Sequence, residues 1–570
     1  MKEAQQALRH LWQELYGTDK TELLEGLFEE ISLFNQQYHP PALSPEWYKD
    51  VVVYSLYVDL FNENFAGLRD KLPYLNELGV TCLWLLPILD SPMRDAGFDI
   101  RDYRRIRPEL LPQDEAETAF PAFLKEAASF GIRVIFDIAI NHTSETHHWF
   151  QEALKSPDNP YRDYYIWSEK PDQYLDARII FQGIEESNWA RAGDAWFFHR
   201  FFDFQPDLNY RNPRVLVEMC RHFLYWLSVG VDGFRADAIP YLWKEEGTDC
   251  ENLPQTHLLV KFFRQVLDWA RPHTLLLAEA CQKPVEVVKY FGQGDECHAG
   301  YHFPLMPQLF KAIAAESALP VMHTLSEEIT PPIPESSQWF TFLRCHDELS
   351  LELVYVSEED RKYIHDHYCK QDQWNFRLGQ GISARLSELM DRDPQKILLA
   401  YAMMLSLPGT PVIYYGDEFG KTNDQAYYHQ QIKAVGKDDT RFLVRGRIDW
   451  QELEAALQKP DSLAAQVFPR VKTLINVRNL YPAFGRGRIE WLKATDASGN
   501  SANPVLAFIR KQTEADILCL FNLAANQITF RLEGAHFSSF EMIAGEEPVY
   551  QAQTNQWTLP GRSWQWIKIS

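Results

Sequence analysis

The sequence predicts an α/β protein built on a closed (β/α)8 (TIM) barrel, with a helical N-terminal extension, a subdomain inserted after the third strand and a C-terminal antiparallel β-sandwich. Three observations carry this prediction. Short β-branched and aromatic runs alternate with amphipathic helical stretches, eight such runs occur in the middle of the chain, and the helical pattern stops after about residue 484. Near-continuous apolar strands separated by helices are typical of a parallel sheet covered on both faces.

The N-terminal residues 1–45 are expected to form the helical extension. Leucines recur at helical spacing from Leu8 to Leu15, and a second apolar periodicity runs from Leu23 to Ile31. The segment HPPALSP (39–45) then ends the pattern, because proline removes a backbone donor and clashes with the preceding turn.

The barrel is expected to occupy residues 46–142 and 213–483. Its eight predicted strands are VVVYSLYV (51–58), TCLWLLP (81–87), VIFDIAI (134–140), VDGFRADA (231–238), TLLLAEA (274–280), HAGYHF (298–303), WFTFLRCHD (339–347) and TPVIYYGDE (410–418).

Two further units complete the predicted organisation. Residues 143–212 are too long for a bare loop between the third and fourth strands, so we expect an inserted subdomain here, called subdomain B. Its expected short strands are YRDYYIWS (161–168) and ARIIFQG (177–183). Residues 484–570 are expected to form the sandwich, with strands in VLAFIRK, DILCLFNLA, QITFRLE and SWQWIKIS.

Composition narrows the class of partner. The 570 residues carry 56 Lys and Arg against 79 Asp and Glu, a formal net charge of −23, which argues against nucleic acid and anionic membranes as partners. The N-terminus lacks an apolar signal segment, and the eight cysteines are scattered without CxxC pairs, so a reducing cytoplasmic location is expected. A neutral small molecule fits best, and the aromatic content of 14% suits the apolar faces of sugars.

Polar residues end four of the eight predicted strands. In a (β/α)8 barrel the carboxyl ends of the strands form one rim, on which active sites are built. Three carboxylates, two imidazoles and one guanidinium would meet there, namely Asp237, Glu279, Asp347, His142, His346 and Arg235.

The predicted environments of Asp237 and Glu279 favour different chemical roles for the two carboxylates. Arg235 and Asp237 are two apart on one strand face, where the cation favours an ionised, nucleophilic carboxylate. Glu279 follows the apolar run TLLLA, and a desolvated carboxyl with a raised pKa suits a general acid. A retaining glycosidase needs this pair, and Asp347 would orient the sugar hydroxyls.

The chain from Trp47 onward resembles the α-amylase superfamily, glycoside hydrolase family 13. The ordered motifs of that family stand as DIAINH (137–142), GFRADA (233–238), LLLAEA (275–280) and CHD (345–347). The resemblance implies that Asp237 is the nucleophile, Glu279 the acid/base and Asp347 the transition-state stabiliser. It also implies a terminal-glucose site formed by Phe98, His142, Arg235 and His346.

Local segments resemble two subgroups of the family. QPDLN (205–209) is similar to the subgroup that handles short α-glucosides, which includes oligo-1,6-glucosidases, amylosucrases and trehalose synthases. FLRCHDELSLELV (342–354) is similar to trehalose synthases, which interconvert maltose and trehalose. The helical extension and KDDTR (437–441) are similar to amylosucrases, in which the arginine matching Arg441 would pair with Asp99 and close the pocket behind the glucose. The resemblance also implies one structural calcium site, with Asn141 and Asp207 as ligands; no other cofactor is expected.

The predicted function is therefore that of a retaining α-glucoside enzyme acting through a covalent glucosyl-enzyme intermediate. Intramolecular transglucosylation between maltose and trehalose is the leading hypothesis. The alternatives are a sucrose-active, amylosucrase-like transglucosylase or hydrolase, an exo-acting α-glucosidase and, remotely, a non-catalytic scaffold. Linkage preference, acceptor and oligomeric state stay open at this point.

Overall fold

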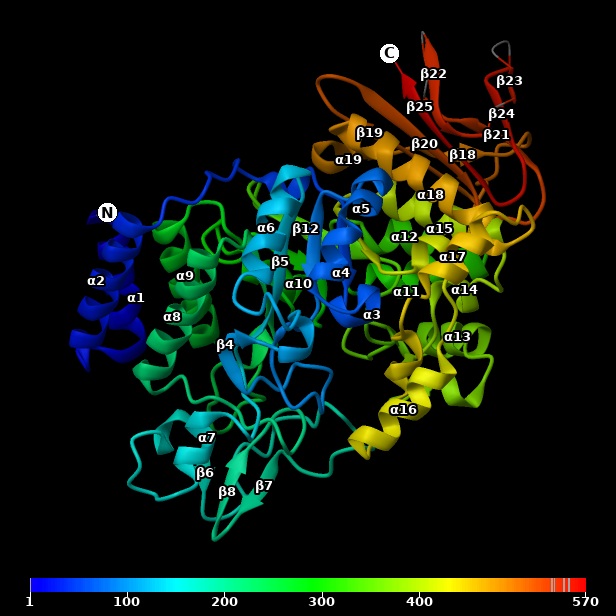
Figure 1. Cartoon of the computed structure of the whole chain (residues 1–570). Helices are drawn as coiled ribbons and strands as arrows, with labels where there is room; N and C mark the ends of the chain where they lie inside the picture. Colours follow the sequence, from blue (N-terminus) through cyan, green and yellow to red (C-terminus); the bar gives the residue numbers. More distant parts are fainter. Residues whose placement is uncertain (1, 535–536, 538, 547–548, 552–553, 570) are drawn as a thin grey trace.

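The eight predicted runs form a closed parallel barrel in the computed structural model, which describes residues 2–534, 537, 539–546, 549–551 and 554–569 (Figure 1). Neighbours around the barrel follow chain order, and the last strand closes onto the first, so the predicted fold class is confirmed. The barrel strands are β1 (Val53–Leu56), β2 (Cys82–Leu85), β5 (Arg133–Ala139), β9 (Gly233–Asp237), β10 (Leu275–Ala278), β11 (Ala299–Tyr301), β12 (Gln338–Phe342) and β16 (Thr410–Tyr414).

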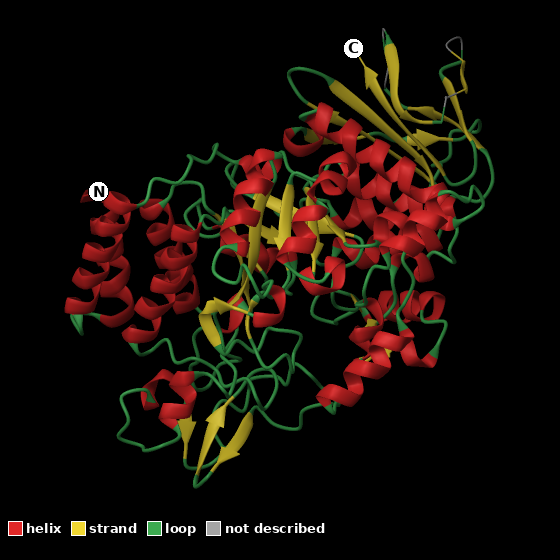
Figure 2. Ribbon diagram, viewed as in Figure 1, coloured by secondary structure: helices red, strands yellow, loops and turns green. Residues whose placement is uncertain are grey.

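Helices surround the barrel between these strands (Figure 2). Every residue of β1, β2 and β10 is buried, which explains why these strands are apolar without alternation. The helices of this unit that precede β16 are α3 (Val58–Asn62), α4 (Phe65–Asp70), α5 (Leu72–Leu78), α6 (Ala119–Ser129), α8 (Pro213–Val229), α9 (Pro254–Ala270), α10 (Pro284–Val287), α11 (Leu305–Ala314), α12 (Leu319–Thr324), α13 (Glu358–Tyr368), α14 (Leu386–Leu389) and α15 (Pro394–Ser406). The helices that follow β16 are α16 (Gln425–Val435), α17 (Trp450–Leu457), α18 (Leu463–Leu480) and α19 (Ala483–Arg486).

The N-terminal extension is a pair of helices, α1 (Lys2–Tyr16) and α2 (Thr21–Gln37), drawn in blue beside α8 and α9 in Figure 1. Helix α1 packs against α9 and α2 against α8. The buried side chains of Leu8 and Trp12 form part of the contact, and the Tyr16 hydroxyl donates a hydrogen bond to the Tyr210 carbonyl at 2.8 Å. The pair is therefore anchored on the barrel.

Subdomain B follows β5, as expected. It contains α7 (His148–Ala153) and a small antiparallel sheet in the order β6–β8–β7, formed by β6 (Trp167–Ser168), β7 (Trp189–Ala192) and β8 (Ala195–Phe198). Only the end of the predicted strand 161–168 is extended in this sheet, and the strand predicted at 177–183 is wrong. That segment is irregular because Arg178, Ile180 and Phe181 line a cavity instead of pairing with a neighbouring strand.

The C-terminal unit consists of two antiparallel sheets around an apolar core of its own. Each of the four predicted strand segments contains a strand. The first sheet has the order β17–β19–β20–β25–β22 and contains β17 (Arg488–Trp491), β19 (Val505–Lys511), β20 (Asp516–Asn522), β25 (Ser563–Ile569) and β22 (Phe540–Gly545). The second has the order β18–β21–β24–β23 and contains β18 (Ala494–Thr495), β21 (Ile528–Leu532), β24 (Gln556–Leu559) and β23 (Val549–Gln551).

Long loops at the carboxyl rim carry short strands that sequence reasoning did not predict. The pair β3 (Leu89–Asp90) and β4 (Asp102–Ile106) follows β2, and a three-stranded sheet follows β12, made of β13 (Leu349–Ser350), β14 (Asn375–Phe376) and β15 (Gly381–Ile382).

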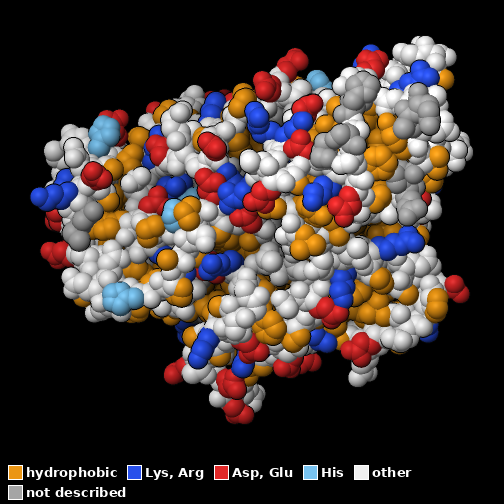
Figure 3. Space-filling model, turned by 90° about the horizontal axis from the view of Figure 1, so that it is seen from above, with side chains coloured by type: hydrophobic (Ala, Val, Ile, Leu, Met, Phe, Trp, Pro, Cys, Tyr) orange, Lys and Arg blue, Asp and Glu red, His pale blue; other side chains and the backbone are white. Residues whose placement is uncertain are grey.

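Acidic and basic side chains are interspersed over the face seen in Figure 3. Among the described residues, no helix has both the length and the apolar character needed to cross a membrane.

Candidate active site

A cavity opens at the carboxyl ends of the barrel strands, and most of the predicted site residues line it. Asp99, Asn141 and Asp207 do not. The predicted residues on the cavity wall are Phe98, His142, Arg235, Asp237, Glu279, His346, Asp347 and Arg441.

Arg235 joins the carboxylates of two neighbouring strands. The strand register pairs Asp137 of β5 with Arg235 of β9. The Arg235 guanidinium lies 2.7 Å from Asp137 Oδ1 and also donates to Asp237, whose side chain is 13% exposed and faces the cavity. Burial raises the pKa of Asp237, and Arg235 opposes this shift. The arrangement holds a carboxylate oxygen ready to attack a carbon in the cavity.

Glu279 follows β10, immediately beside the end of β9. Its Oε2 accepts the backbone N–H of Ala238 at 3.0 Å, while its Oε1 is 3.8 Å from Arg235. Burial raises the pKa of Glu279 to about 7, which agrees with the desolvated general acid predicted from the apolar run before it. A carboxyl with this pKa can donate a proton and take one back near neutral pH.

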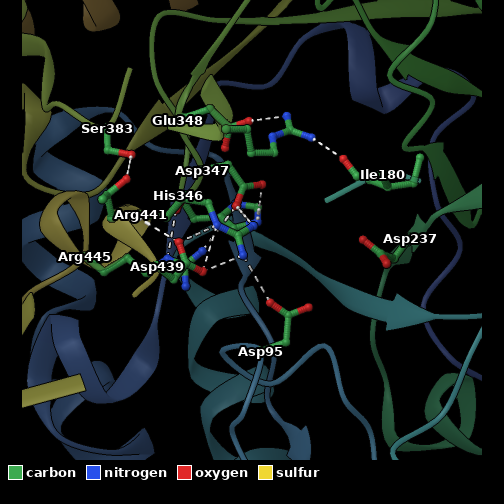
Figure 4. Close-up of polar contacts among 12 residues, drawn as sticks. Asp95, Ile180, Asp237, His346, Asp347, Glu348, Ser383, Asp439, Arg441 and Arg445 are labelled. Carbon is green, nitrogen blue, oxygen red and sulfur yellow. Dashed lines mark hydrogen bonds and ion pairs between the residues drawn. The ribbon is translucent and has the colours of Figure 1, made fainter. Parts of the chain in front are cut away.

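Asp347 lies in a cluster of cations after β12 (Figure 4). Its Oδ1 is 3.0 Å from Arg441 and 3.2 Å from Arg445, and its Oδ2 is 3.1 Å from His346 Nε2. Burial would raise the pKa of Asp347, but His346 and the two arginines lower it below its ordinary value. This carboxylate is therefore ionised and fixed in position.

Arg441 pairs with Asp95 and not with Asp99, so the predicted Arg441–Asp99 pair is wrong. The guanidinium of Arg441 lies 3.4 Å from Asp95 Oδ1. Asp99 is fully buried and turned away, because its carboxylate accepts the Ser91 hydroxyl and the backbone N–H groups of Arg94 and Asp95. Asp99 thus shapes the loop, and the loop presents Asp95 to the cavity.

Phe98 and His346 form the aromatic wall of the cavity. Their rings stack with centroids 5.3 Å apart at an angle of 22°. Gln205 links His142 to Asp95. Its side-chain amide nitrogen lies 3.4 Å from His142 Nε2 and donates a hydrogen bond to the Asp95 carboxylate at 3.0 Å. A flat apolar face beside fixed polar groups matches the two sides of a pyranose ring.

Asn141 and Asp207 meet as predicted, but a lysine lies between them. The Nζ of Lys244 is 2.8 Å from Asn141 Oδ1 and 2.7 Å from Asp207 Oδ2. An ammonium group bonded to both side chains repels a second cation, so these residues do not fit a calcium ion. At the position where the sequence predicted a calcium site, Lys244 bridges Asn141 and Asp207 instead.

The outer half of the cavity is tied together by ion pairs that sequence reasoning missed. Arg178 of subdomain B contacts Glu352 at 3.3 Å and Glu251 at 2.8 Å. Arg377 contacts Glu348 at 2.7 Å and Glu352 at 2.8 Å, and also donates to a backbone carbonyl of subdomain B. Glu348 and Glu352, which lie four residues apart directly after the CHD motif, were the sequence signal that could have indicated these ion pairs.

Fold and site together define a retaining, α-glucoside-active enzyme class. Residues 62–481 match the family model described as the alpha-amylase catalytic domain, and the chain belongs to the α-amylase family. The barrel, the motif order and the three carboxylates on the rim are consistent with this membership.

Among curated relatives, a trehalose synthase/amylase of Mycobacterium tuberculosis (strain ATCC 25618 / H37Rv) is 39% identical over 563 residues, which cover 92% of this chain and 91% of that protein. A trehalose synthase of Thermus thermophilus is 45% identical over 520 residues, covering 86% of this chain and 52% of that protein. The crystal structure of an α-amylase from H. orenii has a TM-score of 0.70 at 24% identity and covers 92% of this chain and all of that one. This last likeness bears on the fold alone.

Proposed function

We propose that this protein is a trehalose synthase, which isomerises maltose to trehalose and back through a covalent glucosyl-enzyme intermediate. Relatives carrying that name match most of the chain. The observation that supports the proposal within the molecule is the outer half of the cavity, which Arg178 and Arg377 bridge and in which a released glucose can be kept while it turns.

The first half of the proposed reaction uses the two carboxylates at the ends of β9 and β10. A carboxylate oxygen of Asp237 attacks the anomeric carbon of the terminal glucosyl unit, and the bond from that carbon to O4 of the second glucose breaks. Glu279 donates its proton to O4 as the bond breaks. Asp347 holds the glucosyl hydroxyls, and Phe98 covers the face of the ring.

In the second half of the proposed reaction, the glucosyl group is transferred back to the released glucose, but to its anomeric oxygen instead of O4. The released glucose turns within the cavity so that its anomeric hydroxyl faces the intermediate. Glu279, now a carboxylate, removes the proton from that hydroxyl, whose oxygen attacks the glucosyl carbon and expels Asp237. The product is trehalose, and Glu279 is protonated for the next turnover.

Transfer rather than hydrolysis requires that water stays away while the glucose turns. Arg178 and Arg377 join subdomain B to the loop after β12 above the outer half of the cavity. Apolar side chains of Ile180, Phe181 and Phe303 line the same region. A bridged, partly apolar cavity keeps the acceptor close to the intermediate and limits access of water.

The test is incubation of the purified protein with maltose, trehalose and sucrose in separate reactions, with all sugars separated by chromatography. We expect trehalose from maltose and maltose from trehalose. Fructose release, with turnover confined to sucrose, would replace the proposal with an amylosucrase-like activity. Glucose as the sole product would indicate an α-glucosidase.

Replacing Arg178 with Ala is expected to shift the reaction toward hydrolysis. The variant loses the pairs to Glu251 and Glu352 that tie subdomain B to the barrel loops, so water reaches the intermediate more readily. The ratio of free glucose to trehalose formed from maltose should rise on the order of 5-fold. Arg191→Ala, on the exposed surface of subdomain B, is the matched control and should leave the ratio unchanged. An unchanged ratio in the Arg178 variant would contradict the role of these ion pairs in limiting access of water.

A further inference from the structure

We propose that the ammonium group of Lys244 is a built-in structural cation between the barrel and subdomain B, and that this chain therefore needs no calcium at this position. The contact joins three separate parts of the chain. Asn141 follows β5, Asp207 lies on the segment returning from subdomain B, and Lys244 lies in the loop after β9.

The three side chains form one buried group. Asn141 and Asp207 are fully buried, and the Lys244 residue is 3% exposed. The Nζ of Lys244 reaches Asn141 Oδ1 at 2.8 Å and Asp207 Oδ2 at 2.7 Å. A buried ammonium is stable only when opposite charge and acceptors surround it, and this site supplies both.

The oxygen atoms needed by a metal ion are already in use. Calcium takes six to eight oxygen ligands. Of the two Asp207 oxygens, Oδ1 accepts the backbone N–H of Arg200 at 2.9 Å and Oδ2 pairs with Lys244. The Asn141 side-chain oxygen also accepts from Lys244. A calcium ion would have to displace the lysine, whose charge already balances the aspartate.

The residues that Lys244 contacts also adjoin His142 of the cavity wall. Asp207 forms an antiparallel bridge with His142, and the N–H of Leu208 donates to the Asn141 carbonyl at 2.8 Å. The Lys244 backbone is itself fixed, because the Arg211 guanidinium donates to its carbonyl at 2.9 Å. The Lys244 contact therefore fixes the segment that carries His142.

The first test uses the wild-type protein. Its thermal midpoint is measured by differential scanning calorimetry after treatment with EDTA and again with excess calcium chloride. We expect the same midpoint in both conditions. A midpoint that falls in EDTA and returns with calcium would overturn the proposal, and this measurement needs no variant to fold.

The second test uses two variants at the same position. Lys244→Met leaves Asp207 buried without a cation, and we expect its midpoint to fall by about 5 °C in either condition. Lys244→Glu places a third oxygen-bearing side chain beside Asn141 and Asp207, so it should bind calcium in titration calorimetry and regain stability with it.

Lys170→Met and Lys170→Glu, at an exposed lysine of subdomain B, are the matched controls and should match the wild type in both conditions. A Lys244→Met protein with the wild-type midpoint, or a Lys244→Glu protein indifferent to calcium, would show that the position is not a cation site.

Discussion

Replacing Asp237 with Asn is expected to lower kcat for maltose by on the order of 10⁴-fold. The amide keeps the size of the side chain and can still contact Arg235, but it is not a nucleophile toward the anomeric carbon. No glucosyl-enzyme forms, so isomerisation and glucose release should fall together. Initial rates of trehalose and glucose formation from maltose measure both.

The design of this experiment separates chemistry from folding. Asp194→Asn, at an exposed position of subdomain B, is the control and should keep the wild-type rate. Thermal midpoints of the two variants check that the barrel is intact. An Asp237 variant that is folded and as active as the wild type would rule out the proposed mechanism and leave the non-catalytic scaffold or another nucleophile.

Replacing Glu279 with Gln is expected to lower kcat for maltose by about 10²- to 10⁴-fold. Departure of a sugar hydroxyl requires a proton, and the amide cannot donate one as a carboxylic acid does. A 4-nitrophenyl α-glucoside has a leaving group that needs no protonation, so formation of the glucosyl-enzyme from it should be nearly as fast as in the wild type. A burst of nitrophenol followed by slow turnover is the expected signature.

The same residue determines the expected pH dependence. Burial raises the pKa of Glu279 to about 7, and the first step requires its protonated form. The value of kcat/KM for maltose should therefore fall as the pH rises through about 7, and this alkaline limb should be absent from the Glu279→Gln variant. Glu186→Gln, at an exposed glutamate, should keep the limb. If kcat/KM of the Glu279→Gln variant still falls as the pH rises through about 7, a group other than Glu279 is responsible for this pH dependence.

The barrel and its catalytic rim could be predicted because both depend on local patterns. Apolar runs alternating with amphipathic helices are read within short windows, and the closed parallel topology brings the strand ends together whatever the loops do. For this reason Asp237, Glu279 and Asp347 lie on one cavity wall, as expected. The apolar run before Glu279 likewise predicted the raised pKa, because neighbours in the strand produce the desolvation.

Contacts between distant loops could not be predicted in the same way. Asp95 and Asp99 both flank Phe98, and only the folded loop shows that Asp99 binds backbone N–H groups while Asp95 faces Arg441. The segment 177–183 has strand composition, yet its side chains line the cavity, so tertiary contacts override its local propensity.

The sequence by itself determined the fold class, the family and the three carboxylates, because these follow from periodicity and from motifs within single strands. The tertiary structure decided what surrounds them: the partner of Arg441, the arginines that bridge the outer cavity and the lysine at the predicted calcium position. The physical reason is that an ion pair or a cation site depends on the distance between side chains brought together from far apart in the chain. Lys244 illustrates this, since its buried ammonium meets Asn141 and Asp207 only after three separate segments have packed.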